Sequence, residues 1–160
     1  SIPNGWETVT YDTSQYDPGD QIYETKQKTT YFKVYVIRNE GDVNDFETLI
    51  NYVYRYMEPV LWPLTGPGKE VQFLTHQESD SSLATIPFQF KGKNAAKLAY
   101  LEMDDTPMDG EKPYDRIGTY IAYQCNNSIV VIYYNYYKGI EAKANKAITT
   151  ILDSFQPNCK

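Results

Sequence analysis

The sequence predicts an α+β domain in which an antiparallel sheet packs against two helices. Three observations support this fold class. Several segments are rich in β-branched and aromatic residues, two segments carry amphipathic helical stripes, and short polar turns separate successive strands. Strands joined by short turns run antiparallel, and amphipathic helices need apolar sheet surface to cover. We expect one domain over residues 1–160, because we find no shift in composition and no internal repeat.

The first half of the chain predicts two strands and one helix. A short strand follows Trp6, and the turn residues 17–20, with sequence DPGD, mark a surface loop after it. Residues 29–38 alternate β-branched and aromatic residues and predict a strand. Residues 44–61 predict a helix, in which Asn44 is the expected N-cap and Glu47 completes a capping box. Pro59 marks the end of this helix.

The second half predicts a run of strands and a final helix. Residues 70–79 and 83–92 are expected to be two strands joined by a polar turn, and residues 95–103 a third. Residues 118–125 and 128–137 are expected to pair as a hairpin around the turn at residues 126–127. Residues 139–155 carry a second amphipathic stripe and predict the closing helix.

Composition excludes several classes of function. The chain is 41% hydrophobic, which is typical of a globular protein, and it holds no apolar run of the ~20 residues that a membrane helix needs. Its formal net charge is -6 and its pI about 4.8. Nucleic-acid binding depends on clustered lysine and arginine. Because the densest lysines are scattered, we expect no nucleic-acid partner; these lysines are Lys26, Lys28, Lys91, Lys93 and Lys97.

Several features favour an extracytoplasmic location, either periplasmic or in the cell envelope. The chain starts at Ser1 and shows no signal segment, so we expect that such a segment has been removed. A lipid anchor upstream of the sequence, which would make the protein a lipoprotein, stays open. Cys125 and Cys159 are candidates for one disulfide, which persists in oxidising compartments. Abundant Tyr, Asn, Thr and Ser are also common in secreted bacterial proteins.

Several short segments resemble the PsbP family, the extrinsic subunits of photosystem II, and its wider superfamily. That superfamily includes a nuclear-import factor that binds the Ran GTPase and many bacterial envelope proteins. The resemblance lies in "IPNGW" at residues 2–6, in Gly92, Ala95 and Tyr100 of "FQFKGKNAAKLAYLE", and in "GTYIAYQCNNSIVVIYYNYY". It extends to "ITTILDSFQP", with Ser154 and Phe155 near its end. This resemblance implies an antiparallel sheet sandwiched between helices, an α/β/α arrangement, but no specific activity or ligand site.

The sequence shows no catalytic or metal-binding constellation. His76 is the sole histidine, and although Ser79, Ser81 and Ser82 follow it, no nucleophile-elbow motif surrounds them. The acidic segment at residues 104–116 offers Asp105 and Asp109 as weak metal candidates. Tested as a calcium loop, this segment has proline and arginine where ligands belong, so a solvated loop is the better interpretation. We therefore expect no enzyme, no metal and no cofactor.

Tyrosine is the most unusual feature of the composition, with sixteen residues. Four lie in the strand at residues 128–137, whose two faces both begin aliphatic and end in tyrosine. This pattern is typical of a strand buried on both faces that emerges toward solvent at one end. The alternative is a ligand surface, because tyrosine offers a large amphipathic ring. The candidate binding residues are Tyr52, Tyr56, Tyr134, Tyr136 and Tyr137.

These observations favour a non-enzymatic accessory or assembly protein that acts through protein–protein contact with an unknown partner. The alternative is a small-ligand or glycan binding protein that uses the tyrosine-rich surface. A hydrolase that uses His76 or the acidic segment is the third and weakest hypothesis.

Overall fold

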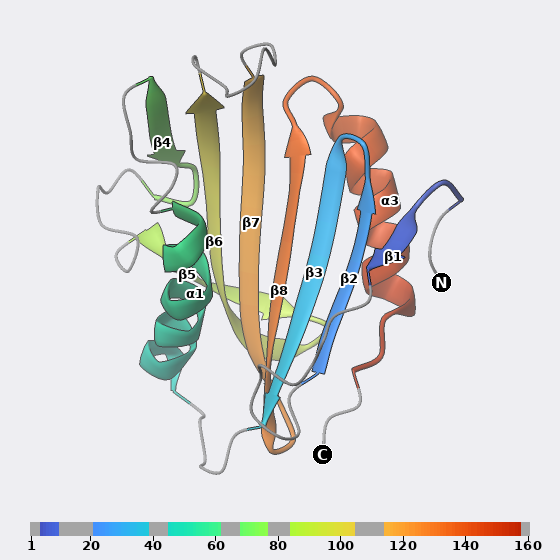
Figure 1. Cartoon of the computed structure of the whole chain (residues 1–160). Coiled ribbons are helices and arrows are strands. Elements are labelled where there is room, and N and C mark those ends of the chain that lie inside the picture. The colour runs from blue at the N-terminus through green and yellow to red at the C-terminus, as the bar shows by residue number, and fades with distance from the viewer. Residues whose placement is uncertain are drawn as a thin grey trace.

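A single antiparallel sheet forms the centre of the protein (Figure 1). The computed structural model describes residues 4–9, 21–38, 45–61, 68–76, 84–104 and 114–157. In chain order its elements are β1 (Glu7–Val9), β2 (Gln21–Gln27), β3 (Thr30–Arg38), α1 (Phe46–Leu61), β4 (Lys69–Phe73), β5 (Ile86–Phe90), β6 (Lys93–Asp104), β7 (Tyr114–Cys125), β8 (Ser128–Tyr137) and α3 (Glu141–Ser154).

The strands follow the order β1-β2-β3-β8-β7-β6-β4, and every pairing is antiparallel. The predicted β7–β8 hairpin is confirmed, with Asn126 in a left-handed conformation at φ 53°. The strand predicted at residues 95–103 is also confirmed within β6. The long β8 strand at the centre therefore has neighbours on both edges, β3 and β7.

Two predictions about the strands need correction. The strand β2 was not predicted, because its sequence QIYETKQ is mostly polar. The strands β4 and β5 were expected to be joined by a short polar turn, and two strands joined in this way are expected to pair with each other. Instead they pair with successive parts of β6, β4 with Tyr100–Asp104 and β5 with Lys93–Lys97. The long β6 strand offers one edge with room for both.

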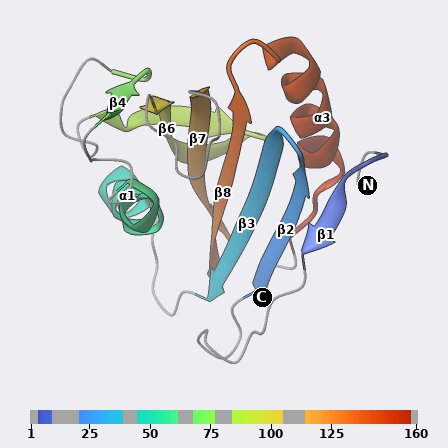
Figure 2. The same cartoon turned by 45° about the horizontal axis from the view of Figure 1, so that its top comes forward.

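The two helices cover opposite faces of the sheet, as the α/β/α arrangement requires (Figure 2). On one face α1 contributes Leu49, Val53 and Met57 to a core formed with β6, β7 and β8. On the other face α3 contributes Ala144, Ile148 and Ile151 to a second core. Burial of these apolar stripes, worth about 25 cal/mol per Å² of apolar surface, holds the helices on the sheet.

Helix α1 begins one residue later than the predicted cap implies. The carboxylate of Asp45 accepts a hydrogen bond of 2.7 Å from the backbone N–H of Thr48, so Asp45, rather than Asn44, provides the N-cap. Among the described residues, no helix is long and apolar enough to cross a membrane.

Candidate functional site

A pocket of about 390 Å³ opens at the end of the sheet where the turn at residues 28–29 joins β2 to β3. We call it the end pocket. Its lining comes from the β2–β3 hairpin, the start of β7 and the end of β8. The lining residues are Lys26, Gln27, Lys28, Thr29, Thr30, Tyr31, Arg116, Tyr133, Asn135 and Tyr137.

The strand register brings these residues to one place. Tyr31 on β3 lies opposite Asn135 on β8, and Arg116 on β7 lies opposite Tyr137. Cross-strand partners project to the same face of a sheet, here the face that α1 covers elsewhere. The backbone N–H of Tyr137 also donates 3.2 Å to the carbonyl of Thr29, which fixes the hairpin turn against the end of β8.

A buried hydrogen-bond network lies behind the pocket. The side-chain amide of Asn135 donates 2.6 Å to the hydroxyl of Tyr133, which lies 3.1 Å from the hydroxyl of Tyr100. Tyr100 reaches this position because its ring lies over Gly118, where a Cβ would fall 2.3 Å from the ring atom Cζ. The glycine in the middle of β7 therefore makes room for the network.

Four tyrosine rings form a connected row across the sheet. We call Tyr31, Tyr133, Tyr120 and Tyr100 the tyrosine row. Successive ring centroids lie 5.8, 4.4 and 6.4 Å apart, and Tyr120 stacks on Tyr133 with an interplanar angle of 17°. Aromatic pairs at such separations add to the stability given by burial alone. The row therefore joins the interior of the sheet to the wall of the end pocket.

The charges of the end pocket are positive. Lys26, Lys28 and Arg116 line it, and among the described residues no acidic side chain does. The guanidinium of Arg116 lies 5.1 Å from the ring centroid of Tyr137 and is 3.4 Å from its hydroxyl oxygen. This combination of a cation over an aromatic face and a hydrogen bond holds the guanidinium at the pocket wall.

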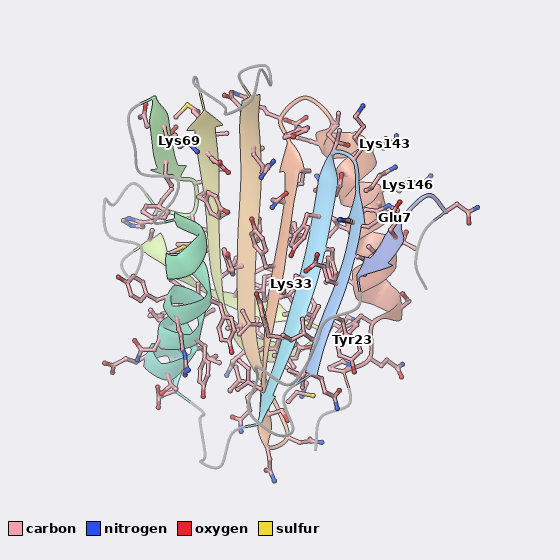
Figure 3. All side chains as sticks on the ribbon, viewed as in Figure 1. Glu7, Tyr23, Lys33, Lys69, Lys143 and Lys146 are labelled. Atoms are coloured by element: carbon pink, nitrogen blue, oxygen red, sulfur yellow. The ribbon has the colours of Figure 1, made fainter. Side chains whose placement is uncertain are left out.

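A partly buried carboxylate lies next to the pocket and is already engaged. The hydroxyl of Tyr31 donates 2.6 Å to Glu24, and the Lys33 ammonium lies 3.5 Å from the same carboxylate. Figure 3 shows Lys33 over the middle of the sheet. Glu24 therefore orients Tyr31 at the pocket wall without lining the pocket itself.

Tyr31 and Tyr133 of the pocket wall keep their protons at neutral pH. Burial raises the pKa of Tyr31, and the hydrogen bond to Glu24 raises it further. Burial also raises the pKa of Tyr133, although the hydrogen bonds from Tyr100 and Asn135 and the charge of Arg116 act in the opposite direction. These hydroxyls serve as neutral hydrogen-bonding groups, so the positive charge of the lining is not offset by phenolate.

The structure does not bring the five predicted binding tyrosines together. Tyr52 and Tyr56 pack from α1 onto the core of one face, where Tyr56 contacts Tyr35 at 4.4 Å between ring centroids. Tyr134 and Tyr136 belong to the core of the other face. Tyr137 alone of the five lines the end pocket. The burial of β8 on both faces, by contrast, confirms the prediction for that strand.

The other predicted sites are placed only in part. His76 is exposed just after β4, while the serines proposed as its partners lie outside the described residues. Asp105 and Asp109 also lie outside them. Within the described ranges, no three His, Cys, Asp or Glu side chains gather as a metal site would need. Cys125 is disulfide-bonded, and Cys159 lies outside the described residues, so the pairing of these two stays a prediction.

Most of the end pocket has no direct signal in the sequence. Lys26 and Lys28 are scattered along the sequence, and the strand β2 that carries Lys26 has no clear strand pattern. Tyr31, Asn135 and Arg116 come from three strands distant in sequence, and only the register places them together. Gly118, a glycine inside a predicted strand, was a signal that another side chain or backbone approaches the strand closely at this position.

Comparison with known proteins places the fold. No sequence family and no curated protein matches the chain. Among solved structures, the cyanobacterial PsbP protein CyanoP from Synechocystis sp. PCC 6803 superimposes with a TM-score of 0.56 at 14% identity, over 97% of this chain and 83% of CyanoP. The chain has the PsbP-like fold. The PsbP-like resemblance of its short segments is therefore matched by its whole topology.

Two further structures are similar at lower TM-scores. PA94 from Pseudomonas aeruginosa, a protein of unknown function, gives 0.48 at 12% identity, over 98% of this chain and 100% of PA94. LpqN from Mycobacterium tuberculosis, which is involved in cell envelope biogenesis, gives 0.41 at 12% identity, over 96% of this chain and 79% of LpqN. At such identities a PsbP-like fold does not determine what the chain binds.

Proposed function

We propose that this chain is a non-enzymatic extracytoplasmic accessory or assembly protein that acts by protein–protein contact. The contact surface is the end of the sheet that holds the end pocket. One observation carries the proposal: a tyrosine-lined pocket of about 390 Å³ opens at one end of the sheet, between residues of the four strands β2, β3, β7 and β8. Tyrosine and arginine at its wall are the residue types that dominate the energetics of protein interfaces.

The surrounding structure supports a preformed contact surface. The Asn135 amide, the Tyr133 hydroxyl and the Tyr100 hydroxyl hold one another in place, and Arg116 is held over Tyr137. Side chains fixed before binding lose little conformational entropy when a partner arrives. A rigid pocket therefore suits recognition of a partner's projecting side chain.

The extracytoplasmic part of the proposal is supported by the cysteine chemistry. Cys125 is disulfide-bonded, and structural disulfides persist mainly in oxidising compartments outside the cytosol. The test is to locate the protein by fractionating cells of its source. Recovery in the cytosol with reduced cysteines would argue against this location.

Site-specific photo-crosslinking tests the contact surface. A benzophenone amino acid replaces Lys28 at the pocket rim in one variant, and Lys146 on α3 in the control; Figure 3 labels Lys146 on that helix. We expect a crosslinked protein from position 28 in intact cells and none from position 146. Equal crosslinking from both positions, or none from position 28, would contradict the proposed contact surface.

A small-ligand or glycan binding protein is the second candidate function. The volume of the end pocket favours it, because pockets for small molecules typically enclose about 300–1,000 Å³. Equilibrium dialysis of the purified chain against labelled monosaccharides tests this candidate. Saturable binding that is lost when Tyr137 is replaced by alanine would favour it over protein contact.

A further inference from the structure

The lining of the end pocket is positive in a protein that is acidic overall. The whole chain carries a formal charge of -6, yet the described residues that line this pocket include three cations and no carboxylate. Within the described ranges, neither Lys26 nor Lys28 makes an ion pair. Each of their ammonium groups offers three hydrogen-bond donors at the pocket rim.

Two described carboxylates near the pocket lie outside its lining and are already paired with other cations. Glu24 accepts from Tyr31 and pairs with Lys33, and Asp115 pairs with Lys138 at 3.0 Å. Both acids therefore have cationic partners of their own. They do not compete with a ligand for Lys26 or Lys28.

Counting formal charges around the pocket gives the size of the charge that it can accept. The cations on this part of the face are Lys26, Lys28, Lys33 and Arg116. Among the described side chains, the carboxylates on this part of the face are Glu7 opposite Lys26, Glu24 opposite Lys33 and Glu102 opposite Arg116. Within this described set, four cations against three carboxylates leave one net positive charge. A monoanion balances this charge better than a doubly charged phosphate does.

The donor groups suit a carboxylate in particular. Charge-assisted hydrogen bonds from ammonium and guanidinium groups to a carboxylate are about twice as strong as neutral ones. Arg116 stands at the wall and the two lysines at the rim. The aromatic faces of Tyr31 and Tyr137 provide apolar contact for the carbon atoms that carry the carboxylate.

We propose that the end pocket binds a single carboxylate, which an acidic side chain of a protein partner supplies. The source of the carboxylate rests on the proposed function, whereas its chemistry rests on the charges and donors of the pocket alone. The same chemistry also fits the carboxylate of a small acid such as glucuronate. The experiment therefore contains one arm for each source.

The experiment titrates the full-length, isotope-labelled chain with matched probes and follows its NMR spectrum. The first pair of probes is a blocked Gly/Ser heptapeptide with one central glutamate and the same peptide with glutamine. The second pair is glucuronate and neutral glucose. We expect the glutamate peptide to shift the signals of Arg116 Nε–H, the Asn135 side-chain amide and the Thr29 backbone amide. The glutamine peptide and glucose should leave these signals unchanged.

Charge-neutral variants locate the binding. The double variant Lys26→Gln/Lys28→Gln removes both rim cations, and both residues are exposed, so folding is unaffected. The control Lys143→Gln/Lys146→Gln makes the same charge change on exposed residues of α3. We expect the rim variant to lose affinity at least about tenfold, because hydrogen bonds to charged groups are the strong ones. The control should bind as the unmodified chain does, and added salt should weaken binding in both.

The outcomes separate this proposal from the proposed function. Equal binding of the glutamate and glutamine peptides, or equal loss in the rim and control variants, would overturn the carboxylate site. Crosslinking from position 28 would in that case still support protein contact. Binding of glucuronate without binding of the glutamate peptide would overturn the peptide source and favour a small acidic ligand. A fifth probe is the same heptapeptide with phosphoserine in place of glutamate, and stronger binding of this peptide than of the glutamate peptide would refute the single-charge argument.

Discussion

At the scale of single residues, the two stacked tyrosines Tyr120 and Tyr133 of the tyrosine row differ in the hydrogen bonds that their hydroxyl groups make. Tyr133 shares hydrogen bonds with Asn135 and Tyr100, whereas the buried hydroxyl of Tyr120 has no hydrogen-bond partner among the described residues. We expect Tyr133→Phe to lower the free energy of unfolding by about 1–3 kcal/mol, because it leaves the buried Asn135 amide unsatisfied. Urea unfolding measures this change.

The variant Tyr120→Phe is the matched control for that prediction. It removes a hydroxyl of the same kind from the neighbouring ring but breaks no hydrogen bond. We expect stability within about 0.5 kcal/mol of the parent, or slightly above it, since no desolvated partner is left behind. Equal losses in the two phenylalanine variants would show that the network behind the end pocket contributes nothing.

Gly118 is the second residue whose role can be tested alone. A methyl group at this position would lie 2.3 Å from Cζ and 2.6 Å from the hydroxyl oxygen of Tyr100, a ring with no solvent exposure. We expect Gly118→Ala to destabilise the protein by about 1–3 kcal/mol, which is the usual result of overpacking. Thermal or urea unfolding measures this effect.

A double-mutant cycle attributes the effect of Gly118→Ala to Tyr100. In a Tyr100→Leu background the ring is gone, so the alanine at position 118 should be tolerated with much less loss. If the substitution is as harmful in that background as in the parent, the close approach of Tyr100 is not its cause.

At the scale of elements, the first turn of α1 depends on Asp45. Hydrogen bonds from the backbone N–H and then the side chain of Thr48 lower the pKa of this carboxylate below its ordinary value of 3.8. A carboxylate with a lowered pKa in the folded state stabilises the fold above its ordinary pKa. This contribution disappears as the pH falls through the lowered value. We expect Asp45→Ala to be less stable than the parent at pH 7, with the difference shrinking below pH 3.8.

The variant Asp45→Asn separates the cap from the charge. Asparagine keeps a side-chain oxygen that accepts from Thr48, but it does not titrate. Its stability should lie between those of the parent and of Asp45→Ala at pH 7. The difference in unfolding free energy between Asp45→Asn and Asp45→Ala should not change with pH, because neither side chain titrates. Urea unfolding at several pH values checks both statements, and a pH-independent loss in Asp45→Ala would contradict them.

The elements differ in how well their sequences predict them. The amphipathic stripes of α1 and α3 and the apolar runs of β3 and β8 were predictable, because the local pattern of apolar residues indicates which positions are buried. The strand β2 was not, because its residues alternate only weakly. Its place is fixed by pairing along all of its length with β3. The partners of β4 and β5 were also hidden, since both depend on the unusual length of β6.

At the scale of the whole molecule, the end pocket shows why a site can escape prediction when the fold does not. Its residues come from β2, β3, β7 and β8, and it exists only because the register aligns the ends of these strands. The four tyrosines of β8 suggested a shared binding surface. However, Tyr136 lies on the opposite face of the sheet from Tyr137. A register shift of one residue would exchange these faces, and local sequence alone does not set the register.

A disulfide at Cys125 constrains the last part of the chain. Cys125 at the end of β7 is disulfide-bonded and packs against the core that also contacts Phe155, just after α3. The sequence has one other cysteine, Cys159, so we expect a Cys125–Cys159 bond that closes a loop around β8 and α3. A disulfide across a loop of this length stabilises a domain by about 2–4 kcal/mol, largely by restricting the unfolded chain.

Reduction tests this bond and its effect together. The intact mass should rise by two hydrogens on reduction, and a non-reduced peptide map should contain one cross-linked fragment with both cysteines. Reduced protein and the variant Cys125→Ser/Cys159→Ser should unfold at the same lower temperature. The end pocket lies at the opposite end of β8 from the β7–β8 turn beside Cys125, so carboxylate binding should persist in the variant. A mass that reduction leaves unchanged, or a map that links Cys125 to a second molecule, would refute the intramolecular bond.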